Sequence, residues 1–175
     1  MVNKDIYSQG IVSSVPHVCP CGYFGSQQKK CKCTPNQIER YMAKISGPML
    51  DRIDIHIDVP SVTFSKLRSK QESISSAEIR ERVIAAREIQ RKRYGEKKTT
   101  TNATMTHRQV SKHCGLDESA EMVLKNAMME FGLSARAHDK ICKVARTIAD
   151  LTDEENISAE HVAEAVSYRK LDRSL

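Results

Sequence analysis

The stretch SARAHDKICKVARTIADL, residues 134–151, indicates most directly which kind of fold the chain adopts. Its apolar residues recur at spacings of three and four, as they do on one face of an α-helix. The residues on this face are Ile141, Val144, Ala145 and Ile148. Ser134 is a favourable cap, because its hydroxyl can accept a hydrogen bond from a free backbone N–H of the first turn. We therefore predict a helix that begins after Ser134 and buries one apolar face.

Three further helices are predicted between residues 105 and 175. THRQVSKHCG (106–115) and DESAEMVLKNAMMEFG (117–132) precede the first stretch, and SAEHVAEAVSYRK (158–170) follows it. The first is capped by Thr106 and closed by Gly115, the second carries an apolar stripe with the helical period, and the last starts at Ser158. In the last helix the residues expected to be buried are Val162, Ala163 and Val166. Because only short loops join the four helices, they predict a small helical bundle.

A long basic helix is predicted upstream, in SSAEIRERVIAAREIQRKRYG (75–95). Ser75 and Glu78 have the spacing of a capping box, and Gly95 is a favourable end. Its apolar stripe consists of Ile79, Val83, Ala86 and Ile89. Its remaining surface carries Arg80, Arg82, Arg87, Arg91, Lys92 and Arg93. The polar residues 96–105 that follow predict a linker, where we place a boundary.

Two elements are predicted before this helix. TPNQIERYMAKISG (34–47) is typical of a helix that starts at Thr34 and is ended by Gly47. In IDIHIDVP (53–60) every second residue is apolar, which predicts a half-buried β-strand. The residues expected on its buried face are Ile53, Ile55, Ile57 and Val59.

Four cysteines gather in CPCGYFGSQQKKCKC (19–33) as two Cys-x-Cys pairs. The first 18 residues lack the apolar core of a signal peptide, so we expect a cytoplasmic protein with reduced thiols. A disulfide within so short a pair would also be strained. The prediction is a structural zinc ion, and the alternative is a loop of unligated thiols. The expected ligands are Cys19, Cys21, Cys31 and Cys33, whereas Cys114 and Cys142 are expected in the core.

The charge of the chain favours acidic partners. Its 175 residues carry a formal net charge of +6, which suits nucleic acid but also suits a well-solvated helical surface. No apolar run reaches the roughly 18 residues that a membrane span requires. The seven glycines form neither a phosphate loop nor a dinucleotide-binding motif, and no H-E-x-x-H motif occurs. On its own, the chain therefore lacks the parts that hydrolyse a nucleotide.

Two arginines are candidates for contacting a phosphate. Arg52 precedes the predicted strand, where it could project a rigid cation onto a phosphoryl group. The alternative is an ion pair with Asp51 or Asp54. Arg136 falls in the first turn of its helix, where a cation opposes the helix dipole. This placement indicates an anion bound at the helix start, and the alternative is a solvated arginine.

Four blocks of the sequence together resemble the magnesium-chelatase-related AAA+ ATPases of bacteria, in their competence-linked, branch-migration helicase branch. The blocks are CPCGYFG, CKCTPNQIERYMAKISGPMLDRIDIHIDVP, SSAEIRERVIAAREIQRKRYG and LSARAHDKICKVARTIADL. The resemblance covers about residues 19–173, and residues 1–18 look unrelated to the family. It implies a mainly α-helical chain in which a short β segment ends an AAA+ core and a helical lid bundle follows. The implied parts are the end of the core (19–65), the basic helix and linker (66–104) and the lid (105–175).

The resemblance also implies roles for both arginines. Arg52 matches the arginine finger that acts across a subunit interface on the neighbour's ATP, and Arg136 matches the lid's sensor of the ATP phosphates. Further implications are a ring of AAA+ subunits, hexameric in the family, with magnesium-bound ATP and DNA as partners. The family's Walker A and Walker B motifs are missing, and His17 replaces the first sensor asparagine. The chain thus resembles a carboxy-terminal fragment that is inactive alone.

Three functions follow from these observations. The first is a piece of an ATPase that supplies Arg52 and Arg136 to ATP held by another polypeptide. The second is a non-catalytic nucleic-acid binder that uses the basic helix and the zinc knuckle. The third is a non-functional remnant that still folds as a helical bundle.

Overall fold

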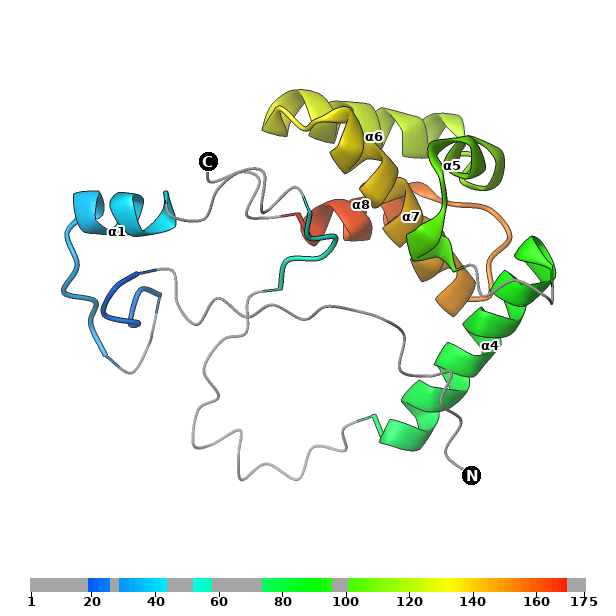
Figure 1. Ribbon diagram of the computed structural model, residues 1–175, viewed down its shortest axis with the longest axis horizontal. Coiled ribbons are helices and arrows are strands. Elements are labelled where there is room, and N and C mark those ends of the chain that lie inside the picture. The colour runs from blue at the N-terminus through cyan, green and yellow to red at the C-terminus, as the bar shows by residue number, and fades with distance from the viewer. Residues whose placement is uncertain (1–18, 26–28, 44–51, 58–73, 96–100, 170–175) are drawn as a thin grey trace. The chain divides into compact units, whose positions relative to one another are not determined.

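The structure is a computed structural model, and it describes residues 19–25, 29–43, 52–57, 74–95 and 101–169 (Figure 1). The chain divides into two compact units, Met1–Ile45 and Ser46–Leu175. The described residues are mainly helical, as the sequence predicts. None of the described helices is both long and apolar enough to cross a membrane.

The first unit contains the cysteine loop and helix α1, Pro35–Met42. Thr34 caps α1 as predicted, and its capping box is completed by Gln37, whose side chain accepts from the Thr34 N–H at 2.9 Å. The helix has no buried residue. Gly47, the expected helix end, lies outside the described residues, and α1 already ends at Met42.

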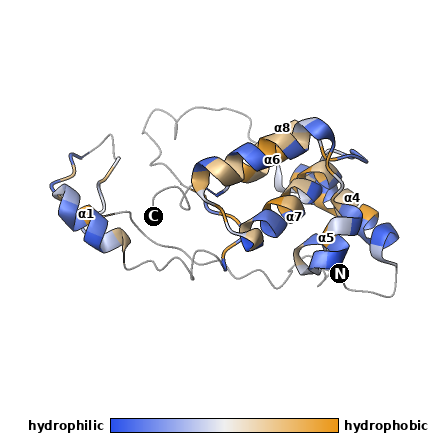
Figure 2. Ribbon diagram, turned by 90° about the horizontal axis from the view of Figure 1, so that it is seen from above, coloured by the Kyte–Doolittle hydropathy of each residue, from blue (hydrophilic) through white to orange (hydrophobic). Residues whose placement is uncertain are grey.

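The second unit is a helical bundle built around α7, Ala135–Leu151. The other bundle helices are α5, His107–His113, α6, Glu118–Phe131, and α8, Ala159–Ser167. α8 packs against both α6 and α7, while α5 packs against α7. Figure 2 shows hydrophobic and hydrophilic stretches alternating along these helices, as expected where one face of each is buried. The core includes Leu124, Ile141, Ile157 and Val162.

The caps predicted at Thr106 and Ser134 are confirmed, and Asp117 is a further cap that was not predicted from the sequence. The Ser134 hydroxyl accepts from the Ala137 N–H at 3.2 Å, at the start of α7. The Asp117 carboxylate accepts from the Ala120 N–H at 2.7 Å, at the start of α6. α6 ends at Gly132, whose φ of 59° lies in the left-handed region that a residue without Cβ adopts at low cost.

One predicted core residue of α8 is wrong. Ala163 is exposed, and Ala165 is buried in its place. The reason is helical spacing, because Val162, Ala165 and Val166 share a face while Ala163 is turned away by about 100°. The prediction that Cys114 and Cys142 are core residues is confirmed.

Helix α4, Ser76–Tyr94, carries the predicted capping box of Ser75 and Glu78 and ends at Gly95. Helix α4 contacts the bundle through α7, and its buried residues, Ala86 and Gln90, lie in its second half. Ala86 is buried as predicted, but Ile79 in the first half is 50% exposed. The predicted apolar stripe is therefore used for packing over only part of its length.

The segment between α4 and α5 was expected to be a polar linker. Its second half instead forms a short 3-10 helix, η2, Asn102–Thr104, which packs against α7. Asn102 and Met105 are 1% and 3% exposed. These residues therefore belong to the packed unit.

The strand predicted for residues 53–60 is not formed over the described residues 52–57. Ile55 and Ile57 are exposed, whereas His56, on the opposite alternation, is buried. A strand needs a neighbouring strand to satisfy its backbone groups, and no named strand occurs among the described residues. The His56 N–H instead donates to the Tyr168 carbonyl at the end of α8, at 2.7 Å.

Candidate functional site

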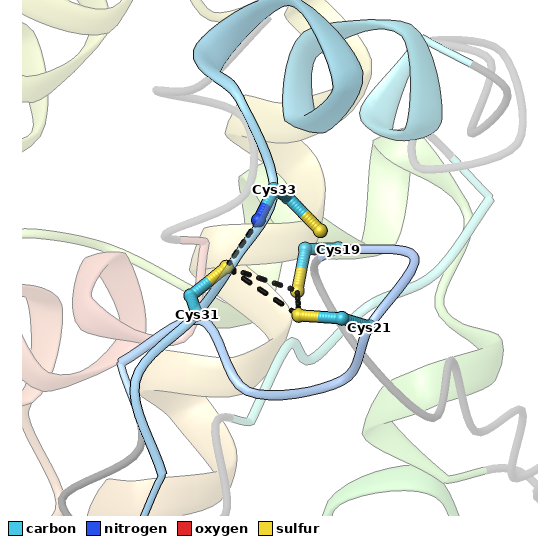
Figure 3. A group of neighbouring side chains, drawn as sticks. All are labelled: Cys19, Cys21, Cys31 and Cys33. Carbon is cyan, nitrogen blue, oxygen red and sulfur yellow. Dashed lines mark hydrogen bonds between the residues drawn. The ribbon is translucent and has the colours of Figure 1, made fainter.

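The four cysteines of the first unit converge on one point (Figure 3). The sulfur of Cys21 lies 3.5 Å from those of Cys19 and Cys31, which are 3.8 Å apart. With Cys33 included, all four sulfurs lie within 4.8 Å of one another. Among the described residues, this is the one group of three or more potential ligands gathered so closely.

The local backbone explains this convergence. Gly22 and Gly25 have φ values of 79° and 75°, so the chain reverses direction after the first cysteine pair. The Gly22 N–H donates to the Cys19 carbonyl at 3.1 Å and closes the turn. The second pair directly precedes α1, whose cap fixes the backbone beside Cys33.

The sulfur spacing fits a tetrahedral metal. A zinc ion with Zn–S bonds of about 2.3 Å places its four sulfurs about 3.8 Å apart. The spacing of the first three sulfurs is close to this value. The cluster can therefore hold a metal ion that favours thiolate ligands.

The cysteines differ in acidity in the absence of a metal. Hydrogen bonds from the backbone N–H groups of Tyr23 and Lys32 lower the pKa of Cys21 to about 6. The Cys33 backbone N–H also favours the Cys31 thiolate, but desolvation and the neighbouring thiols outweigh it and raise the pKa of Cys31 to about 12. Without a metal, Cys21 therefore ionises before Cys31 and Cys33.

Arg136 lies in the second unit, two residues after the Ser134 cap of α7. Its side chain is exposed, while its neighbour Ala137 is 2% exposed and packs inward. The start of α7 is therefore anchored in the bundle, and it presents Arg136 at the surface from a fixed helix end.

Arg52 is also exposed and belongs to the same unit. Asp54, offered above as its ion-pair partner, lies 2.9 Å from the Lys140 ammonium. The segment after Arg52 is held at three points. These points are the Asp54–Lys140 pair, the Arg169 guanidinium on the Ile53 carbonyl, and the His56 N–H on the Tyr168 carbonyl. We call these three contacts the α7–α8 clamp.

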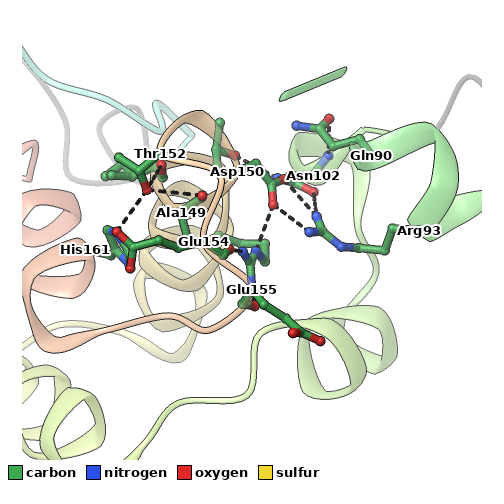
Figure 4. Close-up of polar contacts among 12 residues, drawn as sticks. Gln90, Arg93, Asn102, Ala149, Asp150, Thr152, Glu154, Glu155 and His161 are labelled. Atoms are coloured by element: carbon green, nitrogen blue, oxygen red, sulfur yellow. Dashed lines mark hydrogen bonds and ion pairs between the residues drawn. The ribbon is translucent and has the colours of Figure 1, made fainter. Parts of the chain in front are cut away.

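A buried polar network lies at the other end of α7 (Figure 4). Its centre is Asp150, whose side chain is fully buried. Arg93 of α4 donates both guanidinium arms to Asp150, and Arg146 donates to it at 3.0 Å. The Asn102 amide of η2 donates to it at 2.8 Å. The network thus joins α4, η2 and α7.

Electrostatics hold this network together. Burial alone would raise the pKa of Asp150, but hydrogen bonds from Arg93 and Asn102 outweigh it and leave the pKa below the ordinary value. The two terminal nitrogens of Arg146 donate to the carbonyls of Glu155 and Glu154, each at 2.6 Å. The network therefore also fixes the loop between α7 and α8.

A pocket of about 450 Å³ lies beside this network. Its lining includes Lys112 and Arg146 but also Asp153, Glu154 and Glu155. Cations and carboxylates face the same space, so the pocket is not selective for a phosphate. The candidate phosphate contacts remain the two exposed arginines.

Two family models match most of the chain. The one described as magnesium chelatase, subunit ChlI C-terminal, matches residues 73–169. The one described as magnesium chelatase, subunit ChlI, matches residues 9–67 and so begins inside the segment that looked unrelated. The chain belongs to the magnesium chelatase ChlI family.

Individual proteins resemble this ChlI-family chain along most of its length. A protein named YifB from Salmonella typhimurium is 42% identical over 159 residues, which is 89% of this chain. Competence protein ComM from Haemophilus influenzae is 38% identical over 157 residues, again 89% of the chain. A Mycobacterium tuberculosis protein, Rv2897c, is 30% identical over 87% of it. In each case the match spans 30% of the relative's own length.

In this ChlI-family chain, the structure brings together one of the two predicted sets of site residues. The four cysteines meet, and the arginines occupy exposed positions of the second unit. Sequence reasoning missed the network around Asp150 and placed Arg93 on the solvated face of α4. One signal was available in the sequence. Arg146 precedes Ala149 by three residues and Asp150 by four, so all three lie on the same face of the helix, which is the buried face.

Proposed function

We propose that this chain supplies two arginines to ATP in a ring of magnesium-chelatase-like AAA+ subunits that acts on DNA. Arg52 reaches the ATP of a neighbouring subunit as an arginine finger, and Arg136 contacts ATP phosphates as a sensor. The phosphate loop and the magnesium-binding acids of the assembly come from outside these 175 residues. The family membership of residues 73–169 supports this proposal most strongly, because it covers the bundle that carries Arg136.

The chemistry suits the two positions. A guanidinium is always charged and offers a planar fork of donors to phosphate oxygens. In phosphoryl transfer, such a group stabilises the negative charge that spreads over the transferred phosphoryl group. Arg52 and Arg136 are both exposed, and each is carried by backbone that is fixed to the bundle.

The test is ATP turnover in a mixed assembly of this chain with a full-length family member that carries the phosphate loop. We expect the chain to stimulate turnover, and Arg52→Ala to remove the stimulation, since arginine fingers contribute roughly 10³- to 10⁵-fold to kcat. Arg108→Ala, at an exposed position of α5, is the matched control and should keep it. If the Arg52→Ala chain stimulates ATP turnover as strongly as the wild-type chain, Arg52 is not an arginine finger. Ordinary turnover by the isolated chain would refute the need for a partner.

We also propose that the cysteine cluster holds a structural zinc ion. Cys19, Cys21, Cys31 and Cys33 would complete a closed tetrahedral site, which leaves no position for a substrate. The metal would supply folding energy to the first unit and no chemistry to the reaction. Metal analysis of freshly reduced protein should find about one zinc per chain, lost in Cys31→Ser. Metal-free wild-type protein would exclude this site.

A second candidate function, nucleic-acid binding without catalysis, rests on α4. Arg80, Arg82, Arg91 and Lys92 are exposed on this helix. Phosphate contacts by such side chains weaken steeply with added salt, because binding releases counterions from the nucleic acid. This function predicts DNA affinity that falls with salt, is unaffected by nucleotide and is unchanged by Arg52→Ala. The double variant Arg80→Ala, Arg82→Ala should show a weaker salt dependence of DNA affinity. A wild-type DNA affinity that does not change with salt would exclude this second function.

A further inference from the structure

The burial of Arg169 needs a physical reason. It is 2% exposed, although removing a guanidinium from water is costly unless the charge finds good partners. Its guanidinium donates to the carbonyl of Ile53, the residue directly after Arg52. A hydrogen bond from a charged donor is stronger than a neutral one. Arg169 therefore fixes the backbone from which the Arg52 side chain extends.

Lys140 holds the same segment from α7. Its ammonium lies 2.9 Å from the Asp54 carboxylate, and its side chain is only 16% exposed. A partly sheltered ion pair is less screened by salt than a fully exposed one. Lys140 also follows Arg136 by four residues, so both lie on one face of α7. One helix face thus carries Arg136 and anchors the segment of Arg52.

We infer that Lys140 and Arg169 are positioning residues for Arg52. Through the α7–α8 clamp they place Arg52 relative to the bundle and make it one rigid unit with Arg136. A displacement of α7 that follows ATP contact at Arg136 is therefore passed directly to Arg52. This inference rests on the proposed function, because it concerns how the arginine finger is held and moved.

The expected effect of losing the clamp is kinetic. An arginine finger acts only when its guanidinium meets the phosphoryl group, and a misplacement of about 1 Å can cost roughly 100-fold in rate. In the mixed assembly, we expect Lys140→Gln and Arg169→Lys each to lower kcat about 10- to 100-fold. The KM for ATP should not change, because neither residue holds the nucleotide. Lys125→Gln, at an exposed position of α6, is the control and should keep kcat.

A charge exchange separates positioning from general damage. Lys140→Asp alone places two carboxylates side by side and should lower kcat in the same way. Adding Asp54→Lys restores an opposite-charge pair, so the double variant should recover most of the lost kcat. Absence of recovery, with both chains folded, would count against the clamp.

Hydrogen exchange of the His56 amide gives a readout on the isolated full chain that does not depend on ATP. This amide donates to the Tyr168 carbonyl, so its protection reports the docked segment. We expect faster exchange in Lys140→Gln and Arg169→Lys, with unchanged protection of the core amides of α7. Unchanged His56 exchange would overturn the inference.

The two proposals fail in different ways. If Arg52→Ala leaves kcat unchanged, the proposed arginine finger is wrong, and the positioning inference falls with it. If Arg52→Ala lowers kcat while Lys140→Gln and Arg169→Lys keep it, the finger stands and only the positioning inference is overturned.

Discussion

The Cys21 thiol is more acidic than the thiols of Cys31 and Cys33 in the same cluster. Its pKa of about 6 makes it mostly thiolate at neutral pH, whereas the pKa of Cys31 is raised to about 12. The thiolate is the nucleophile in alkylation. In metal-free, reduced protein we therefore expect iodoacetamide to modify Cys21 before Cys31, at a rate that levels off above about pH 7. Peptide mass spectrometry at successive times measures this order.

The bundle cysteines provide the control for this prediction. Burial raises the pKa of Cys114 to about 11 and of Cys142 to about 12. Both should stay unmodified while the second unit is folded, and both should react in denaturant. Equal labelling of all six cysteines in native protein would contradict the predicted order.

Gly132 is a residue at which backbone conformation alone determines the cost of substitution. Its φ is +59°, and a Cβ added there meets nothing within 4 Å. Gly132→Ala should therefore lower the free energy of unfolding by about 1 kcal/mol through backbone strain without any clash. Gly115→Ala is the matched control, because Gly115 has equal space and no positive φ. Thermal unfolding compares the two, and equal stabilities would disprove the strain argument.

A buried polar network joins helix α4 to the bundle. Asp150 is fully buried between Arg93 and Arg146, which are 15% and 4% exposed in their side chains. Removing one partner of a buried pair leaves the other charges uncompensated. We expect Asp150→Asn to lower the free energy of unfolding by about 3–5 kcal/mol. Glu88→Gln, which breaks an exposed pair with Arg91 on the same helix, should cost less than about 1 kcal/mol in the same denaturant titrations.

The network also predicts the direction of a pH effect. The pKa of Asp150 is lower in the folded chain than in the unfolded chain, where it is about 3.9. The stability from this carboxylate is therefore fully present above about pH 5 and is lost as pH falls through the folded pKa. Wild-type unfolding free energy should decrease below about pH 4, and Asp150→Asn should flatten this decrease. An equally steep acid decrease in the variant would show that other groups cause it.

Local signals predicted the helices well and the polar contacts between them poorly. The caps at Ser75, Thr106 and Ser134 could be predicted because each depends on residues within one turn. The contact of Arg93 with Asp150 joins residues 57 positions apart, so no local pattern contains it. The same limit explains why the burial of His56 was not predicted, because its backbone N–H bonds to a carbonyl at the end of α8, far along the chain.

At the scale of the whole molecule, the sequence predicted the candidate site unevenly. The cysteine cluster could be predicted because its members lie within 15 residues and share one chemistry. Arg136 is exposed, as both interpretations of the sequence, an anion contact and a solvated arginine, require. The anchoring of Arg52 could not be predicted, because it depends on Lys140 and Arg169 across the second unit.

The two units should respond separately to loss of metal. α1 has eight residues, none of them buried, and isolated helices shorter than about 12–15 residues are marginal in water. Its order therefore depends on the cysteine cluster that directly precedes it. The second unit has its own apolar core and contains no residue of the cluster. A strong zinc chelator should thus unfold the first unit and leave the bundle intact.

Amide NMR spectra measure this separation residue by residue. On chelation, the signals of α1 should move to random-coil positions, while those of α6, α7 and α8 should stay in place. Cys31→Ser should have the same effect without a chelator, because it removes one of four ligands. Cys114→Ala removes a thiol of the bundle core and should leave α1 folded. If α1 stays helical without metal, the cluster does not stabilise it. If the bundle unfolds on chelation, the two units are not independent, because a separate core needs no distant metal to remain packed.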